Sequence, residues 1–483
     1  MAERRQVRML YVPIFNFPRR LEADSIYHIS NDWCRAMVEA DPDLAIYRFM
    51  PAKGTTTYTS FRYTPRKIHP RIHDIQVNMF TWYSMEECHV PFEHVMDHHP
   101  ILGRRPVDIV VSTSAVKTAY MYSVIRAHSR GRMWPALFNF ELLLRSLEGT
   151  NEASFVQESE AIFQAVGETM AYNLFESPKC ADMAASNARS LLAPRLTARI
   201  HANSAMAYSG YPARRGFVGL ESEKFKDFTF LTRGRLAASK GIDKILLTLD
   251  NLYRSGHPIK ALITTGERPS RLNRLYGPII DKMGNLEVMH CKTADEAGEI
   301  MRKCHAFLFW SSHELFAVSV WEMLASGLIG IFKRADWFCD LLPKEYPYVF
   351  DTDEEAYVMA SHVSKNYAAV KKELAWVPGW VAERYEYGVT TSRTIETLRS
   401  KVIEVPYRKW IADALRAHRA DTLTYAQCED IVEAASDMGQ AVMARKGGAS
   451  RPARAVGRAE IREAMFALGF REDLARMDGV FTR

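Results

Sequence analysis

The sequence lacks the marks of several protein classes. Its seven cysteines are an odd number and form no C-x-x-C pair, which argues against a disulfide framework and favours a reducing cytoplasm. No apolar run reaches the roughly 18 residues of a membrane-spanning helix, so no integral membrane association is expected. The short apolar run near the N-terminus ends at Asn16 and Pro18 without a small-residue cleavage site. We interpret it as a first strand and not as a signal peptide.

A strong charge of one sign is also missing. The 483 residues include 63 Lys and Arg against 57 Asp and Glu, a net charge of +6 that permits an anionic partner without requiring one. Hydrophobic residues make up 47% and charged residues 25%, which is typical of a globular chain and not of a disordered one. At roughly 150 residues per domain, the length predicts about three domains or two large ones.

Short apolar runs alternate with helical stretches along most of the chain. This rhythm indicates βαβ units, and it restarts after a Gly-, Pro- and Arg-rich stretch at 211–219. We therefore expect two doubly wound, Rossmann-like domains, over 1–215 and 216–400. The expected strands are 7–12, 44–50, 108–113, 135–140, 174–176, 228–232, 261–265, 286–290, 306–310 and 328–332, and the expected helices include 25–39, 115–127, 240–255, 294–303 and 318–325.

The last part of the chain, 401–483, has a different pattern. It shows no strand run and contains two helical pieces, 426–443 and 461–468. Between them, 445–462 holds six Arg or Lys and one Glu, which is typical of a flexible basic linker. We expect a helical C-terminal extension here.

The first chemical signal is the segment GRLAASKG, 234–241. Gly234 and Arg235 follow an expected strand, and Lys240 and Gly241 open the next helix. The carboxyl end of a parallel strand is where α/β sheets bind ligands, and a helix N-terminus favours anions. Two cations at this position can hold a diphosphate. A surface turn with two solvated cations explains the segment equally well when it is taken alone.

The second signal is SSHELFAVSVWEMLASGLIGIF, 311–332. Glu314 lies in the loop after a strand, and Glu322 follows within the next helix. The small residues Ala317 and Ser319 let a ligand approach the helix N-terminus closely. A carboxylate can accept hydrogen bonds from two neighbouring sugar hydroxyls. Alone, the spacing is equally consistent with a charge–dipole contact at a helix start.

Together the segments read G-R-x4-K-G and S-x-x-E-x-F-x5-E-x-x-A-x-G, and they resemble the retaining glycosyltransferases of family 4, which have the GT-B fold. The resemblance is best over 228–345 and extends more loosely over 1–400. It implies a nucleotide-sugar donor, UDP- or GDP-linked, with no resident cofactor or metal. It also implies attack on the same face of the sugar, assisted by the leaving phosphate. Ala317 stands where the family usually has glycine.

The resemblance also implies roles for individual residues. Arg235 and Lys240 would bind the diphosphate, Glu322 the ribose hydroxyls and Glu314 the donor sugar. The phosphate turn would be shaped by Gly234, Ser239 and Gly241. The loop backbone that would approach the sugar or phosphate belongs to Leu315, Phe316, Ala317 and Val318. The D-x-D segments 41–43 and 351–353, which a metal-dependent transferase would need, are interpreted as loop or helix-start residues.

Candidates for the acceptor side come from the first half of the chain. Glu141 ends an expected strand, where a carboxylate can act as a base or orient a sugar. His98 and His99 lie in a histidine-rich run, 88–103, whose spacing matches no standard zinc site. For each of the three residues, a structural role is the favoured interpretation.

The acceptor itself stays open between two main classes. Residues 1–75 hold twelve Lys or Arg against eight acids, and aromatic residues alternate with cations over 61–73. This pattern, with the basic linker, is compatible with a hydroxymethylated base in phage-type DNA, modified in the cytoplasm of a bacterial host. The alternative is a cell-envelope glycan or a lipid-linked sugar, and a small metabolite is a lesser option. A non-catalytic nucleotide-sugar-binding or DNA-binding protein is a further hypothesis of another class.

Overall fold

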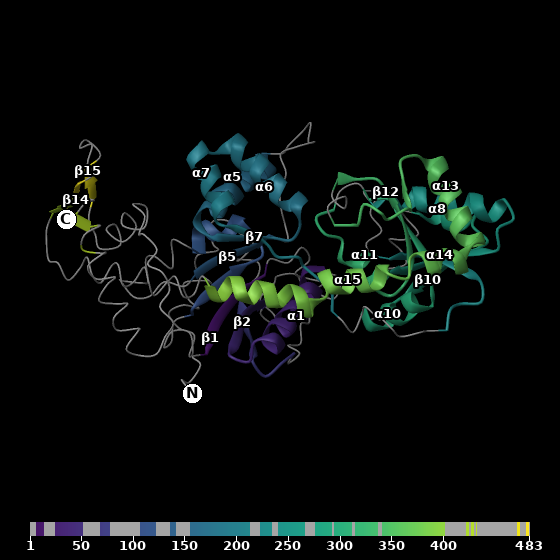
Figure 1. Ribbon diagram of the computed structural model, residues 1–483, viewed down its shortest axis with the longest axis horizontal. Coiled ribbons are helices and arrows are strands. Elements are labelled where there is room, and N and C mark those ends of the chain that lie inside the picture. Colours follow the sequence, from purple (N-terminus) through teal and green to yellow (C-terminus); the bar gives the residue numbers. More distant parts are fainter. Residues whose placement is uncertain are drawn as a thin grey trace. The chain divides into compact units, whose positions relative to one another are not determined.

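In the computed structural model, two sheets of parallel strands dominate the described part of the chain (Figure 1). The structure describes residues 6–13, 25–51, 68–77, 107–121, 136–141, 155–212, 223–233, 240–265, 276–291, 294–311, 314–336 and 341–400, with short pieces between 422 and 482. The chain divides into two compact units: 1–92, 110–121 and 137–395 form one, and 93–109, 122–136 and 396–483 form the other.

The first sheet has seven strands in the order β3-β2-β1-β4-β5-β6-β7. The paired strands are parallel, as the registers of β1 with β2 and of β5 with β6 illustrate. Short, fully buried runs such as VRMLYV form them because both faces of the sheet are covered. The strands are β1 (Val7–Val12), β2 (Leu44–Pro51), β3 (Ile72–Val77), β4 (Ile109–Ser112), β5 (Ala136–Glu141), β6 (Tyr172–Phe175) and β7 (Ser204–Met206).

Helices lie on both sides of this sheet. Figure 1 shows α1 on one side and α5, α6 and α7 together on the other. Connections that run in opposite directions from β1 place their helices on opposite faces, because parallel crossovers are right-handed. The helices are α1 (Ser25–Ala40), the 3-10 turn η2 (Ala115–Lys117), α5 (Phe155–Met170), α6 (Pro178–Leu191) and α7 (Pro194–Ala202). Pro178 and Pro194 stand at the first turns of α6 and α7, where the missing N–H costs nothing.

The second sheet has six strands in the order β10-β9-β8-β11-β12-β13. Its paired strands are also parallel. They are β8 (Phe228–Arg233), β9 (Ile259–Thr265), β10 (Leu286–His290), β11 (Ala306–Phe309), β12 (Ile329–Lys333) and β13 (Val349–Phe350). The helices are α8 (Ile242–Arg254), α10 (Ala294–Lys303), α11 (Val318–Ala325), α13 (Asp353–Lys365), α14 (Tyr367–Glu373) and α15 (Val377–Tyr385), followed by helical residues 387–400.

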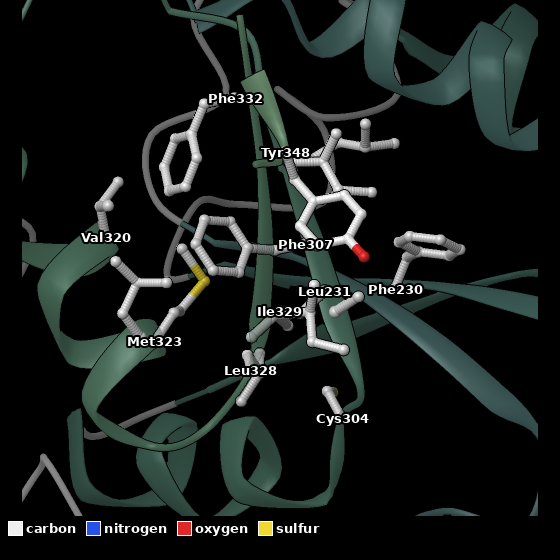
Figure 2. Packing of buried hydrophobic residues seen from close by; sticks show 14 of the residues in the cluster. Phe230, Leu231, Cys304, Phe307, Val320, Met323, Leu328, Ile329, Phe332 and Tyr348 are labelled. Carbon is white, nitrogen blue, oxygen red and sulfur yellow. The ribbon is translucent and has the colours of Figure 1, made fainter. Parts of the chain in front are cut away.

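A single apolar core holds this second sheet to its helices. Figure 2 shows side chains of β11 and β12 packed against Val320 and Met323 of α11. The rings of Phe307 and Phe332 meet edge to face at 5.5 Å between centroids. A Cβ on Gly330 would lie 2.5 Å from the Phe332 ring, so a larger residue would force these aromatic side chains to shift.

The two-domain α/β fold expected from the sequence is therefore confirmed. The boundaries expected at 215/216 and 400/401 stay predictions. The expectation that 401–483 contains no strand is wrong, because β14 (Thr422–Thr424), β16 (Val480–Thr482) and β15 (Arg471–Asp473) form a small antiparallel sheet. Strands of three residues, one of them the charged run Arg-Glu-Asp, are too short for an alternating pattern to be visible.

Candidate functional site

The expected site residues lie at the point where the strand order of the second sheet reverses, between β8 and β11. β8 and β11 are neighbours in the sheet although α8, β9, β10 and α10 separate them in the chain. In an open parallel sheet such a switch point, at the carboxyl ends of the strands, is the usual place for a ligand. The loops that leave β8 and β11 carry the two motifs, and they lead into α8 and α11.

Helix α8 begins at a position that only glycine can occupy. Gly241 is its N-cap, with φ of 62° and ψ of 32° in the left-handed region. A Cβ built on Gly241 would lie 2.6 Å from Cβ of Trp310, the residue that follows β11. Gly241 therefore lets the start of α8 approach the end of β11 closely.

Lys240 and Glu314, one from each loop, are brought together as an ion pair. The Lys240 ammonium donates to Glu314 Oε1, which also accepts a hydrogen bond from Ser311 Oγ at 2.8 Å. Both charged groups are partly exposed, at 24% for Lys240 and 13% for Glu314. A partly exposed pair can exchange partners with a charged ligand at modest cost.

Helix α11 also begins at a left-handed residue. Ala317 is its N-cap with φ of 54°, and among the described residues no side chain caps this helix start. Ala317 is also the one non-glycine residue in the described chain with positive φ. An alanine in this region is strained by about 1 kcal/mol or more, and such strain is often found at functional sites. The first N–H groups of an α-helix have no partner within the helix and can bind an anion.

The residues around Ala317 anchor this helix start. Phe316 is buried, and its carbonyl accepts a hydrogen bond of 2.6 Å from the Trp321 indole. Leu315 packs against an apolar cluster that includes Phe175 and Cys180. Val318 is the first residue of α11. The side chains of Leu315 and Phe316 thus serve packing, so a ligand would meet this loop through its backbone.

Glu322 lies one turn further into α11 and is almost fully buried. Its Oε2 is 2.9 Å from Nη1 of Arg233, the last residue of β8. The sequence reasoning missed Arg233, because a single cation at the end of an apolar strand gives no distinct signal. Its position directly before the first motif was the one available indication.

A further carboxyl group, that of Glu176, lies near Glu314 and was not predicted from the sequence. Glu176 follows β6, is buried, and accepts a hydrogen bond from Ser209 Oγ. Burial raises the pKa of Glu176 to about 7, the Ser209 hydrogen bond opposes the rise, and the negative charge of Glu314 adds to it. Glu176 therefore titrates near neutral pH beside one of the two motifs.

Several expected residues lie outside the described part of the chain. These are Gly234, Arg235, Ser239, His98 and His99. Glu141 is described only by its backbone, which ends β5 at the carboxyl edge of the first sheet, level with Phe175 of β6. Among the described residues, no cluster of three or more His, Cys, Asp or Glu is arranged to hold a metal ion. No helix in that part is both long enough and apolar enough to cross a membrane.

No protein-family model matches the sequence, and no curated protein matches it. Solved structures do resemble the fold. Sucrose-phosphate synthase from Thermosynechococcus elongatus superposes with a TM-score of 0.63 at 10% identity, covering 82% of this chain and all of that one. Anabaena HepE in complex with UDP-glucose gives 0.57 at 10% identity, over 81% of this chain and 99% of that one. The glycosyltransferase WaaG, involved in lipopolysaccharide biosynthesis, gives 0.53 at 13%, over 80% and 98%. The two parallel-sheet domains thus have the GT-B fold.

Proposed function

We propose that this chain is a retaining glycosyltransferase of family 4 type, which moves a sugar from a nucleotide-sugar donor to an acceptor hydroxyl. One observation carries the proposal. The switch point of the second sheet gathers Lys240, Glu314 and Glu322 around two helix starts at left-handed residues. The proximity of a cation, a carboxylate and helix N-termini at this edge of the sheet supports the proposal.

The chemistry of these groups suits departure of a nucleoside diphosphate. Cleavage of the sugar–phosphate bond leaves negative charge on the diphosphate. The Lys240 ammonium and the N-termini of α8 and α11 can stabilise that charge without a metal ion. When the diphosphate takes Lys240, the carboxylate of Glu314 becomes available to the hydroxyls of the donor sugar. Arg235 is proposed as the second cation at the diphosphate.

The nature of the donor is supported by the structural neighbours. HepE is described in complex with UDP-glucose and in complex with UDP and glucose. A further neighbour is a lipopolysaccharide outer core galactosyltransferase, WaaB, with a TM-score of 0.54 at 12% identity. We therefore propose a UDP-sugar as the first donor to test and a GDP-sugar as the second.

The acceptor is proposed to be a sugar hydroxyl of a cell-envelope glycan or lipid-linked saccharide. Two cations of the basic region 1–75 have structural partners and do not form a nucleic-acid surface. Arg48 is buried in an ion pair with Asp74 at 2.8 Å. Arg71 donates to the carbonyl oxygens of Asp41 and Leu44. The hydroxymethylated DNA base is kept as the alternative acceptor, because the other cations of this region and of 445–462 could contact phosphates.

Donor turnover by the purified full-length chain tests this function. The chain is incubated with UDP-glucose or GDP-mannose, with and without EDTA, and the release of UDP or GDP is followed. We expect release from one donor, unaffected by EDTA. Lys240→Met should reduce kcat strongly, because a leaving-group cation is lost. Lys244→Met is the matched control, since Lys244 forms an exposed ion pair with Asp353 outside the site.

The acceptor and the stereochemistry need separate measurements. Hydroxymethylcytosine DNA, hydroxymethyluracil DNA and a lipopolysaccharide core saccharide are offered with the active donor, and products are identified by mass spectrometry. The anomeric configuration of the product, read by NMR, should match that of the donor. Donor binding without any release of nucleotide would instead support the non-catalytic binding protein.

A further inference from the structure

Among the described residues of the switch point, Arg233 and Glu322 form a more enclosed ion pair than Lys240 and Glu314. Glu322 is 3% exposed and Arg233 is 12% exposed, and Arg233 Nη1 is 2.9 Å from Glu322 Oε2. The same Nη1 contacts the Met301 sulfur at 3.2 Å. A carboxylate this deeply buried would be costly without a fixed cation. Arg233 therefore sets where the Glu322 carboxylate lies.

The surroundings of Arg233 point to a polar ligand. Arg233 is level with Thr264 of β9, which in turn is level with Met289 of β10. The Thr264 hydroxyl is buried and has no hydrogen-bond partner in the described part of the chain. Buried hydroxyls are normally hydrogen-bonded, so this hydroxyl, beside a charged pair, is available to a polar ligand.

We propose that Arg233 is a positioning residue for recognition of the donor ribose. It holds the Glu322 carboxylate so that this group accepts hydrogen bonds from the ribose hydroxyls, and it thereby makes the site prefer ribonucleotides over 2′-deoxyribonucleotides. The proposal rests on the proposed function and deepens it. A carboxylate offers about four lone-pair positions, so the arginine and two hydroxyls can share it.

Binding of UDP, GDP and their 2′-deoxy forms to the full-length chain, measured by calorimetry, tests this. We expect the wild type to bind one ribonucleotide about ten-fold more tightly than its deoxy form, because a hydrogen bond to a charged acceptor is lost. In Arg233→Met this ratio should fall to about two or less. Arg233→Lys should keep the charge but lose the planar fork and give an intermediate ratio.

Glu322→Gln and the double variant complete a cycle. If Arg233 acts through Glu322, the double variant should discriminate no less than either single variant. Arg254→Met is the matched control, because it removes an arginine from an exposed ion pair with Asp250 on α8 and should leave every affinity unchanged. Circular dichroism of each variant identifies those that do not fold, and Arg233→Lys is then the deciding variant.

Two results would overturn the inference and can be told apart. If the wild type binds a ribonucleotide selectively and Arg233→Met or Arg233→Lys keeps the full ratio, Arg233 is merely structural and the proposed function survives. If the Arg233 variants lose affinity equally for the ribonucleotide and its 2′-deoxy form, Arg233 is likewise merely structural. If the wild type binds none of the four nucleotides, the proposed function fails together with the inference.

Discussion

In both parallel sheets the order of the strands reverses at one point, between β1 and β4 in the first and between β8 and β11 in the second. The side chains at these two switch points differ. Between β1 and β4, the residues Ser112, Thr113 and Ser114 are buried. Ser112 Oγ donates to Ser114 O at 2.8 Å, and Ser114 Oγ caps η2. Between β8 and β11, ion pairs lie beside helix starts that no side chain caps among the described residues. The described hydroxyl groups of Ser112 and Ser114 already have partners within their own loop, whereas paired charges can be shared with an anion. This contrast is the reason why we propose the second switch point as the diphosphate site.

The largest expected effect comes from Gly241→Ala, which should disrupt the close packing of the start of α8 against the end of β11. The new Cβ would meet Trp310 at 2.6 Å and hold alanine at φ of 62°. We expect a loss of about 3 kcal/mol or more in the free energy of unfolding, together with loss of nucleotide binding. Urea unfolding measures the first and calorimetry the second.

Gly256→Ala is the matched control for this variant. Gly256 has φ of 86°, but a Cβ there would have no atom within 4 Å. It should cost about 1 kcal/mol, from backbone strain alone. Equal losses in the two variants would mean that the close approach to Trp310 contributes nothing.

Glu176→Gln should change how the free energy of unfolding depends on pH. Glu176 belongs to the first domain, and the negative charge of Glu314 in the second domain contributes to its raised pKa. The pKa of Glu176 is about 7 in the folded chain against an ordinary value of 4.5. Between these pH values the unfolded chain loses the proton first, so stability falls as pH rises from about 4.5 to 7 and stays lowered above it. The loss is on the order of 3 kcal/mol.

Glutamine cannot ionise, so Glu176→Gln should remove this part of the pH dependence, as measured by urea unfolding at pH 5 and pH 8. Glu168 adds a similar fall in both proteins, since burial raises its pKa to about 8. The difference between wild type and variant isolates Glu176. An unchanged slope would show that Glu176 does not titrate in this range.

Asn139→Ala should destabilise the first sheet by removing hydrogen bonds between uncharged groups. Asn139 on β5 donates to Asn173 Oδ1 at 2.8 Å and to Gly167 O at 3.4 Å, and it accepts from Thr118. Removing this buried amide leaves its partners unsatisfied, and we expect a loss of about 2 kcal/mol. The loss should be independent of salt, with unchanged nucleotide affinity. A marked salt dependence would contradict the view that this region is held by neutral groups.

Ala317→Gly should have the smallest effect and the opposite sign. Glycine adopts φ of 54° without strain, so this variant should gain about 1 kcal/mol of stability. Thermal unfolding measures the gain. A loss of stability would mean that Ala317 is not strained and that its methyl group packs favourably.

Individual strands and helices show which parts of the fold could be predicted from sequence patterns. The strands expected at 7–12 and 286–290 and the helices at 294–303 and 318–325 were placed within a residue or two, because short buried runs and amphipathic stretches are local signals. The third strand, Ile72–Val77, was missed. Its burial alternates irregularly, and His73, Asp74 and Gln76 interrupt the apolar run. Helix α5 was also missed, although Ser154 and Gln157 have the spacing of a helix-start capping box.

The sequence by itself determined the repeated α/β pattern and the positions of Lys240, Glu314 and Glu322 along the chain, because strand periodicity and loop composition are local properties. Only the tertiary structure decided which residues meet there. The pairing of Arg233 with Glu322 and the approach of Gly241 to Trp310 depend on the order of β8 and β11 in the sheet. The raised pKa of Glu176 likewise depends on burial beside a carboxylate that is distant in the chain. Contacts across such separations come from packing, which no local pattern records.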